Sequence, residues 1–95
     1  MRIISKTPLR ELGEIHSDAV EPLRRWYRIA KAADWSNPAD VRVDFGNADF
    51  VGDFTIFNIA GNKYRLVALV AYQYHIVYVR HVLTHDEYSK GKWKV

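Results

Sequence analysis

The chain has 95 residues, no cysteine and a formal net charge of +3 at pH 7. A chain of this length supports one hydrophobic core, so we expect a single domain over residues 1–95. The absence of Cys excludes disulfides and thiolate metal sites, and no apolar run approaches the roughly 20 residues of a membrane span. Because no export signal opens the chain, we expect a cytoplasmic location and no membrane partner.

The charge is distributed unevenly along the chain. Residues 1–33 hold seven Lys/Arg against four Asp/Glu, residues 34–53 hold one against five, and residues 54–95 hold six against two. A basic C-terminal half suits a polyanionic partner such as RNA, although ordinary solubilising charge explains the same numbers.

The first predicted elements are a short β-prone run over residues 1–5 and two amphipathic helices. The first helix is expected from about Pro8 to His16, because apolar residues recur there at helical spacing. The second is expected from near Asp18 to near Ala33, with Asp18 and Glu21 in capping-box positions. Its basic side suits solvent, a nucleic-acid backbone or an acidic partner; it is formed by Arg24, Arg25, Arg28 and Lys31.

Residues 34–53 predict a long acidic connection with at most one helical turn after Ser36. Alternation of apolar residues is weak in this segment. We expect its aromatic side chains to hold it to the core, namely Trp35, Phe45 and Phe50.

Three β-prone runs follow, over residues 54–59, 64–72 and 76–82, separated by loops of hairpin length. Residues 66–71 contain no polar side chain, which predicts a central strand covered on both faces. Thr84 and Glu87 then form a capping box for a short helical turn, and the basic tail after it is expected to be loosely held. The order predicts an α+β fold in which two helices pack on one face of an antiparallel sheet of three strands, or four if the N-terminal run pairs.

No pattern indicates a metal or cofactor site. The four His have no recognised ligand spacing, and neither a Gly-rich phosphate loop nor a Ser nucleophile motif is present. What remains is a cluster of cationic, His and Tyr residues at the end of the chain. RNA cleavage suits such a cluster, because the ribose 2′-hydroxyl is itself the nucleophile and the protein needs only to move protons and stabilise charge.

Each member of this cluster also has a structural explanation. Arg65 opens an apolar strand, where an arginine serves either a phosphate or a structural ion pair. Arg80 and His81 are adjacent, so they point to opposite faces and at most one shares the Arg65 surface. His85 and Tyr88 are three apart and share a face if the segment is helical, as catalytic residues or as cap and core residues.

Three segments resemble a known family when taken together: residues 57–67 (FNIAGNKYRLV), 77–80 (VYVR) and 84–88 (THDEY). They are similar to the HigB toxins of toxin–antitoxin modules, and the similarity extends over nearly the whole chain. It implies a RelE-like fold, ribosome-dependent cleavage of mRNA, and neutralisation by a helix-turn-helix antitoxin of the HigA type.

The resemblance also implies roles for individual residues. Arg65 matches the arginine that contacts the scissile phosphate, and Tyr88 matches a C-terminal tyrosine that supports the attacking hydroxyl or stacks on the mRNA. Related toxins carry lysines on the preceding strand, where this chain has Ile56 and Asn58. We therefore expect His85 to transfer protons, with Lys63 or Lys90 as alternatives.

The sequence thus predicts a metal-independent endoribonuclease that acts on translated mRNA, with Arg65, His85 and Tyr88 as catalytic residues. The expected RNA-binding residues are Lys63, Arg80, Lys90, Lys92 and Lys94. Two alternatives stay open: a ParE-like toxin that acts on DNA gyrase, and a non-catalytic module that binds RNA or a protein partner.

Overall fold

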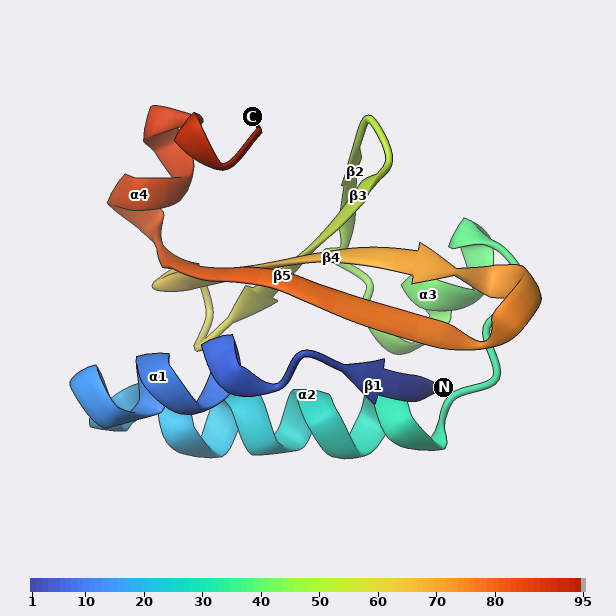
Figure 1. The fold of residues 1–95 in the computed structure, drawn as a ribbon, viewed down its shortest axis with the longest axis horizontal. Helices are drawn as coiled ribbons and strands as arrows, with labels where there is room; N and C mark the ends of the chain where they lie inside the picture. Colours follow the sequence, from blue (N-terminus) through green and yellow to red (C-terminus); the bar gives the residue numbers. More distant parts are fainter. Residues whose placement is uncertain (95) are drawn as a thin grey trace.

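The structure, a computed structural model, describes residues 1–94 and consists of a five-stranded sheet with helices on both sides (Figure 1). The strands are β1 (Arg2–Ile4), β2 (Asp49–Val51), β3 (Phe54–Ile59), β4 (Tyr64–Ala71) and β5 (Ile76–Thr84). The α-helices are α1 (Thr7–Ile15), α2 (Val20–Ala32), α3 (Pro38–Asp44) and α4 (His85–Lys90). Short 3-10 turns cover Ser17–Ala19, Tyr72–Tyr74 and Lys92–Lys94.

The sheet has the order β1-β5-β4-β3-β2, with β1 parallel to β5 and the other neighbours antiparallel. The three predicted strands are confirmed, and β4 is central as expected. The prediction of an antiparallel sheet with three to four strands is wrong, because the sheet is mixed and has five. Both β1 and β2 are only three residues long. The pairing of β1 has no local signal, because its partner strand lies more than 70 residues away, whereas β2 forms a hairpin with β3 across Gly52 and Asp53.

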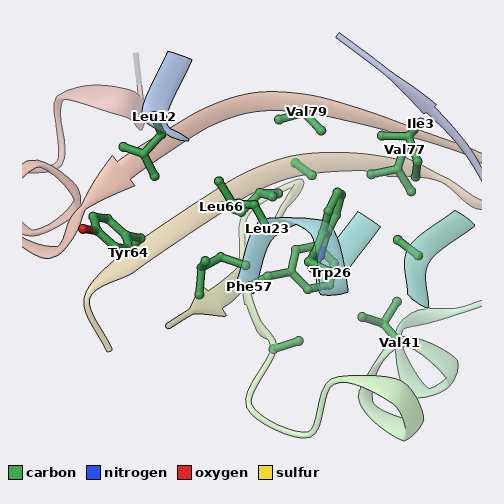
Figure 2. Close-up of a cluster of buried hydrophobic side chains, with 14 of the residues drawn as sticks. Ile3, Leu12, Leu23, Trp26, Val41, Phe57, Tyr64, Leu66, Val77 and Val79 are labelled. Carbon is green, nitrogen blue, oxygen red and sulfur yellow. The ribbon is translucent and has the colours of Figure 1, made fainter. Parts of the chain in front are cut away.

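One face of the sheet packs against α1 and α2 (Figure 1). Figure 2 shows Leu66, Val77 and Val79 from the strands directed toward the same buried cluster as Leu23 and Trp26 of α2. Aromatic rings extend this core toward α3: Phe57 lies edge-on to Trp26 at 5.4 Å and stacks with Trp35 at 6.0 Å. Trp35 is buried, and Phe45 and Phe50 pack against the same core, which confirms that the acidic segment is held by its aromatic side chains.

The opposite face carries a second, smaller core, formed by Ile56, Val67 and Trp93. Tyr88 of α4 packs against it, and α4 lies across the sheet from α1 and α2 (Figure 1). The prediction of a loosely held tail is wrong for Trp93, which is only 5% exposed. The tail turns back because Gly91 adopts φ +73°, a left-handed conformation that suits glycine.

The second predicted helix begins two residues later than expected, at Val20. Asp18 lies in a 3-10 turn and does not cap it, because its carboxylate is used elsewhere. It accepts a hydrogen bond of 2.6 Å from the Tyr64 hydroxyl and lies 3.1 Å from the Lys63 ammonium. This carboxylate therefore ties the α1–α2 connection to the turn between β3 and β4.

The acidic segment contains seven residues of helix, α3, where at most one turn was predicted. Asn37 caps it by accepting a hydrogen bond of 3.1 Å from the Asp40 backbone N–H, and Pro38 occupies its first turn. The apolar alternation that obscured this helix does not mark a strand face, since Val41 is buried whereas Val43 is exposed. No helix within residues 1–94 is both long and apolar enough to span a membrane.

Candidate active site

Arg65 stands at the start of β4, immediately after the turn that joins β3 to β4. Asn62 in that turn holds its guanidinium: Nη1 donates to the Asn62 carbonyl at 3.1 Å and Nη2 to the Asn62 side-chain oxygen at 3.1 Å. Among the residues that the structure describes, Arg65 forms no ion pair with a carboxylate. The guanidinium is therefore oriented by neutral oxygens and keeps its full charge available for an anion.

Tyr88 reaches Arg65 from α4. The predicted capping box of this helix is confirmed: the Thr84 hydroxyl accepts from the Glu87 N–H at 3.2 Å, and the Glu87 carboxylate accepts from the Thr84 N–H at 2.9 Å. These bonds fix the first turn of α4 and place the Tyr88 ring centroid 5.5 Å from the Arg65 guanidinium carbon. The structure thus brings two of the three predicted catalytic residues together.

Arg65 and Tyr88 line a pocket of about 390 Å³ on the sheet face opposite α1 and α2. The strand register explains why: Asn58 pairs with Arg65, and Asp49 pairs with Ile56. Directly paired residues lie on the same face of a sheet. The other residues lining the pocket are Arg42, Gly46, Asn47, Ala48, Asp49, Ile56 and Asn58.

Four polar residues of this pocket were not predicted as site residues: Arg42, Asn47, Asp49 and Asn58. A signal existed for Asn58, because the hairpin between β3 and β4 places it opposite Arg65. No comparable signal existed for the other three. They come from the acidic segment, and it reaches the pocket only through α3 and the pairing of β2 with β3.

The pocket favours the protonated form of the tyrosine. Burial raises the pKa of Tyr88 above its ordinary value, and the Asp49 carboxylate raises the pKa further, whereas Arg65 acts in the opposite direction. The phenol is therefore neutral at physiological pH and carries a proton that it can donate in a hydrogen bond.

His85 is the first residue of α4 and is exposed. Its backbone N–H donates to the Lys63 carbonyl at 2.9 Å, which joins α4 to the β3–β4 turn. It does not line the Arg65–Tyr88 pocket. Because the segment is helical, however, His85 and Tyr88 lie one turn apart on neighbouring positions of the helix surface.

The predicted RNA-binding cations lie outside the pocket. Lys63 faces Asp18, and its Nζ lies 3.1 Å from that carboxylate. Arg80 is exposed at a bulge in β5, where the register jumps from Val67–His81 to Ala68–Val79. The pairing with Val67 places His81 on the Arg65 face, yet both Arg80 and His81 line a different hollow beside α1. The tail lysines are exposed around Trp93; they are Lys90, Lys92 and Lys94.

Comparison with known proteins defines the class. The family model described as "HigB_toxin, RelE-like toxic component of a toxin-antitoxin system" matches residues 19–91. The chain belongs to this HigB toxin family, which confirms the resemblance seen in the three sequence segments.

Individual members of this family align with the chain over almost its full length. The chain is 30% identical over 93 residues to the "mRNA interferase HigB" of Escherichia coli O6:H1 strain CFT073, an alignment that covers 95% of this chain and 90% of the relative. It is 25% identical over 92 residues to the "mRNA interferase toxin HigB" of Escherichia coli strain K12, covering 94% and 88%. An "mRNA interferase HigB" of Shigella flexneri matches to the same extent.

Proposed function

We propose that this chain is a ribosome-dependent endoribonuclease, the toxin of a type II toxin–antitoxin pair, which stops translation by cutting mRNA. The observation that carries the proposal is the meeting of Arg65 and Tyr88 in one pocket of a HigB-family chain. The names of the relatives support the same activity. No observation favours action on DNA gyrase or a purely binding role.

The reaction transfers the phosphodiester within the RNA. The 2′-oxygen of one nucleotide attacks the adjacent phosphorus while a base removes the 2′-hydroxyl proton, the bond to the 5′-oxygen breaks, and an acid returns a proton to that oxygen. The products are a 2′,3′-cyclic phosphate and a 5′-hydroxyl. Negative charge accumulates on the phosphate oxygens in the transition state, so a fixed cation beside them accelerates the step.

Arg65 is suited to this cation. Its planar fork binds two phosphate oxygens at once, and Asn62 already holds it at 3.1 Å on two sides, so little reorganisation is needed. Tyr88 is suited to orient the attacking hydroxyl, because its neutral phenol both donates and accepts hydrogen bonds.

His85 is the proposed proton carrier. Imidazole is a side chain that both accepts and donates protons in general acid–base catalysis, and His85 lies one turn before Tyr88 on the surface of α4. Lys63 is a poorer alternative, because its ammonium lies 3.1 Å from the Asp18 carboxylate. Lys90, at the other end of α4, is the remaining alternative.

The other cations serve the RNA backbone in this proposal. Arg80, Lys63 and the tail lysines contribute to binding without touching the reacting phosphate. The partners are mRNA on the ribosome, in the cytoplasm, and an antitoxin of the helix-turn-helix HigA type.

The decisive experiment incubates the purified chain with a defined mRNA, either free or bound to programmed ribosomes. We expect cleavage on ribosomes and none of free mRNA, with toxicity in cells relieved by the product of the adjacent gene. A parallel assay for trapped gyrase–DNA complexes should be negative. Intact mRNA on ribosomes, with a soluble and folded protein, refutes the proposal.

A further inference from the structure

Ring contacts hold Tyr88 in the pocket. The Arg65 guanidinium carbon lies 5.5 Å from its ring centroid, and the indole of Trp93 stacks on the ring at 5.0 Å with 13° between the planes. Across residues 1–94, the structure gives the Tyr88 hydroxyl no hydrogen-bond partner. The direction in which the hydroxyl points therefore depends on what holds the ring.

Trp93 is itself firmly anchored. The residue is 5% exposed, and its side chain packs with Ile56 and Val67 in the smaller core. Phe54 meets the indole edge-on, with 5.6 Å between ring centroids and 76° between planes. The stack under Tyr88 is thus attached to β3 and β4, the strands that also carry the pocket.

Trp93 also forms a hydrogen bond with the Tyr88 backbone. Its indole N–H donates to the Tyr88 carbonyl at 2.9 Å, and the Gly91 N–H donates to the same oxygen at 3.1 Å. A buried indole N–H needs an acceptor in any case, but here the acceptor belongs to the same residue whose ring the indole stacks on. Together the bond and the stack fix the ring and the main chain of Tyr88 through one side chain.

We propose that Trp93 is a positioning residue that aims the Tyr88 hydroxyl into the Arg65 pocket. This inference rests on the proposed function, in which Tyr88 orients the attacking 2′-hydroxyl. The match to the family model ends at residue 91, so Trp93 lies outside the matched region.

Removing the indole should release Tyr88 while leaving Arg65 in place, because Asn62 holds the guanidinium independently. Displacement of a reacting group by about 1 Å costs on the order of a hundredfold in rate. We expect Trp93→Ala to reduce the single-turnover cleavage rate by about tenfold to a hundredfold at saturating protein. Trp93→Phe loses the N–H bond but keeps a ring that stacks on Tyr88, so it should recover most of the cleavage rate that Trp93→Ala loses.

A double-mutant cycle on programmed ribosomes separates positioning from stability. If Trp93 acts by aiming the hydroxyl, its removal should no longer matter when the hydroxyl is absent. Trp93→Ala in a Tyr88→Phe background should then cleave at the rate of Tyr88→Phe alone. Val77→Ala is the matched control, since Val77 is buried in the other core: it should lower the melting temperature and leave the rate of the folded protein unchanged.

If Trp93→Ala lowers the cleavage rate by the same factor in the wild-type and Tyr88→Phe backgrounds, the proposal is overturned. A Tyr88→Phe protein that cleaves like the wild type would also overturn it. If Trp93→Ala does not fold, Trp93→Phe is carried through the same cycle, and additive losses there overturn it equally.

A second readout does not require activity: the ring signals of Tyr88 in NMR spectra, which a stacked indole shifts. Trp93→Ala should move these signals and lower the pKa of the phenol toward its ordinary value, because burial raises that pKa. Unchanged ring signals overturn the proposed positioning. A wild-type protein that leaves ribosome-bound mRNA intact refutes the proposed function instead, so the two failures are distinguishable.

Discussion

Replacement of Arg65 tests the centre of the proposed site. The guanidinium makes two hydrogen bonds of 3.1 Å to Asn62 and one of 3.4 Å to the Tyr64 carbonyl, all at the rim of a turn. Because these bonds are partly exposed to water, their loss in Arg65→Ala should cost about 1 kcal/mol of unfolding free energy, or roughly 4–8 °C in melting temperature. The transition state loses more, about 3 kcal/mol, which is on the order of a hundredfold in cleavage rate.

The assay is single-turnover cleavage of a defined mRNA on programmed ribosomes, with melting temperature and antitoxin binding measured on the same preparations. Arg65→Lys keeps the charge but loses the fork, so we expect it to recover only part of the rate. Arg2→Ala removes another exposed arginine, from β1, and should leave the rate unchanged. A folded Arg65→Ala protein that cleaves like the wild type would refute the role assigned to the guanidinium.

Three further predictions concern the elements around the pocket. Thr84→Ala removes the cap of α4 and should lower the free energy of unfolding by about 1 kcal/mol. It should also slow cleavage, because the cap helps to place Tyr88; an unchanged cleavage rate would show that Tyr88 does not need the cap. Hydrogen bonding from Tyr64 and Lys63 lowers the pKa of Asp18 in the folded protein. The ionised carboxylate therefore stabilises the folded state above the unfolded pKa of about 3.9, and this contribution is lost as the pH falls through the folded pKa. Asp18→Asn should therefore have a lower melting temperature than the wild type at pH 7, and the difference between the two melting temperatures should become smaller in acid. A difference that does not depend on pH contradicts this prediction. Affinity for ribosome-bound mRNA should fall with rising salt. The slope of log affinity against log salt concentration should become shallower when Lys90, Lys92 and Lys94 are replaced by neutral residues; an unchanged slope would show that these lysines do not contact the RNA.

Local patterns were enough to predict the centre of the fold. Strands β3, β4 and β5 begin where their β-branched and aromatic runs begin, at Phe54, Tyr64 and Ile76. The cap at Thr84 was readable because both halves of a capping box lie within four residues. Arg65 and Tyr88 were predicted through the family resemblance, and the structure adds that they share a pocket.

Long-range placement could not be predicted from the sequence. The pairing of Arg2–Ile4 with β5 depends on the whole intervening chain, and the entry of Asp49 into the pocket depends on where α3 directs the acidic segment. The burial of Trp93 was missed for a different reason. A lone tryptophan among lysines has the composition of a solvated tail, and only the fold reveals the apolar surface beneath it.

The bulge at Arg80 also has a consequence for solubility. In the part of the chain that the structure describes, β1 pairs with β5 only at Ile76–Tyr78, so the remainder of β5 forms part of the sheet edge. Although α1 lies beside this stretch, a strand edge that is left uncovered is a template on which strands from other molecules add and aggregate. The extra residue at the bulge breaks the regular spacing of backbone donors and acceptors there, and it presents a charged side chain. The bulge and the charge of Arg80 are therefore expected to disfavour edge-to-edge association. Arg80→Val should increase aggregation, measured by light scattering, while the melting temperature stays close to that of the wild type.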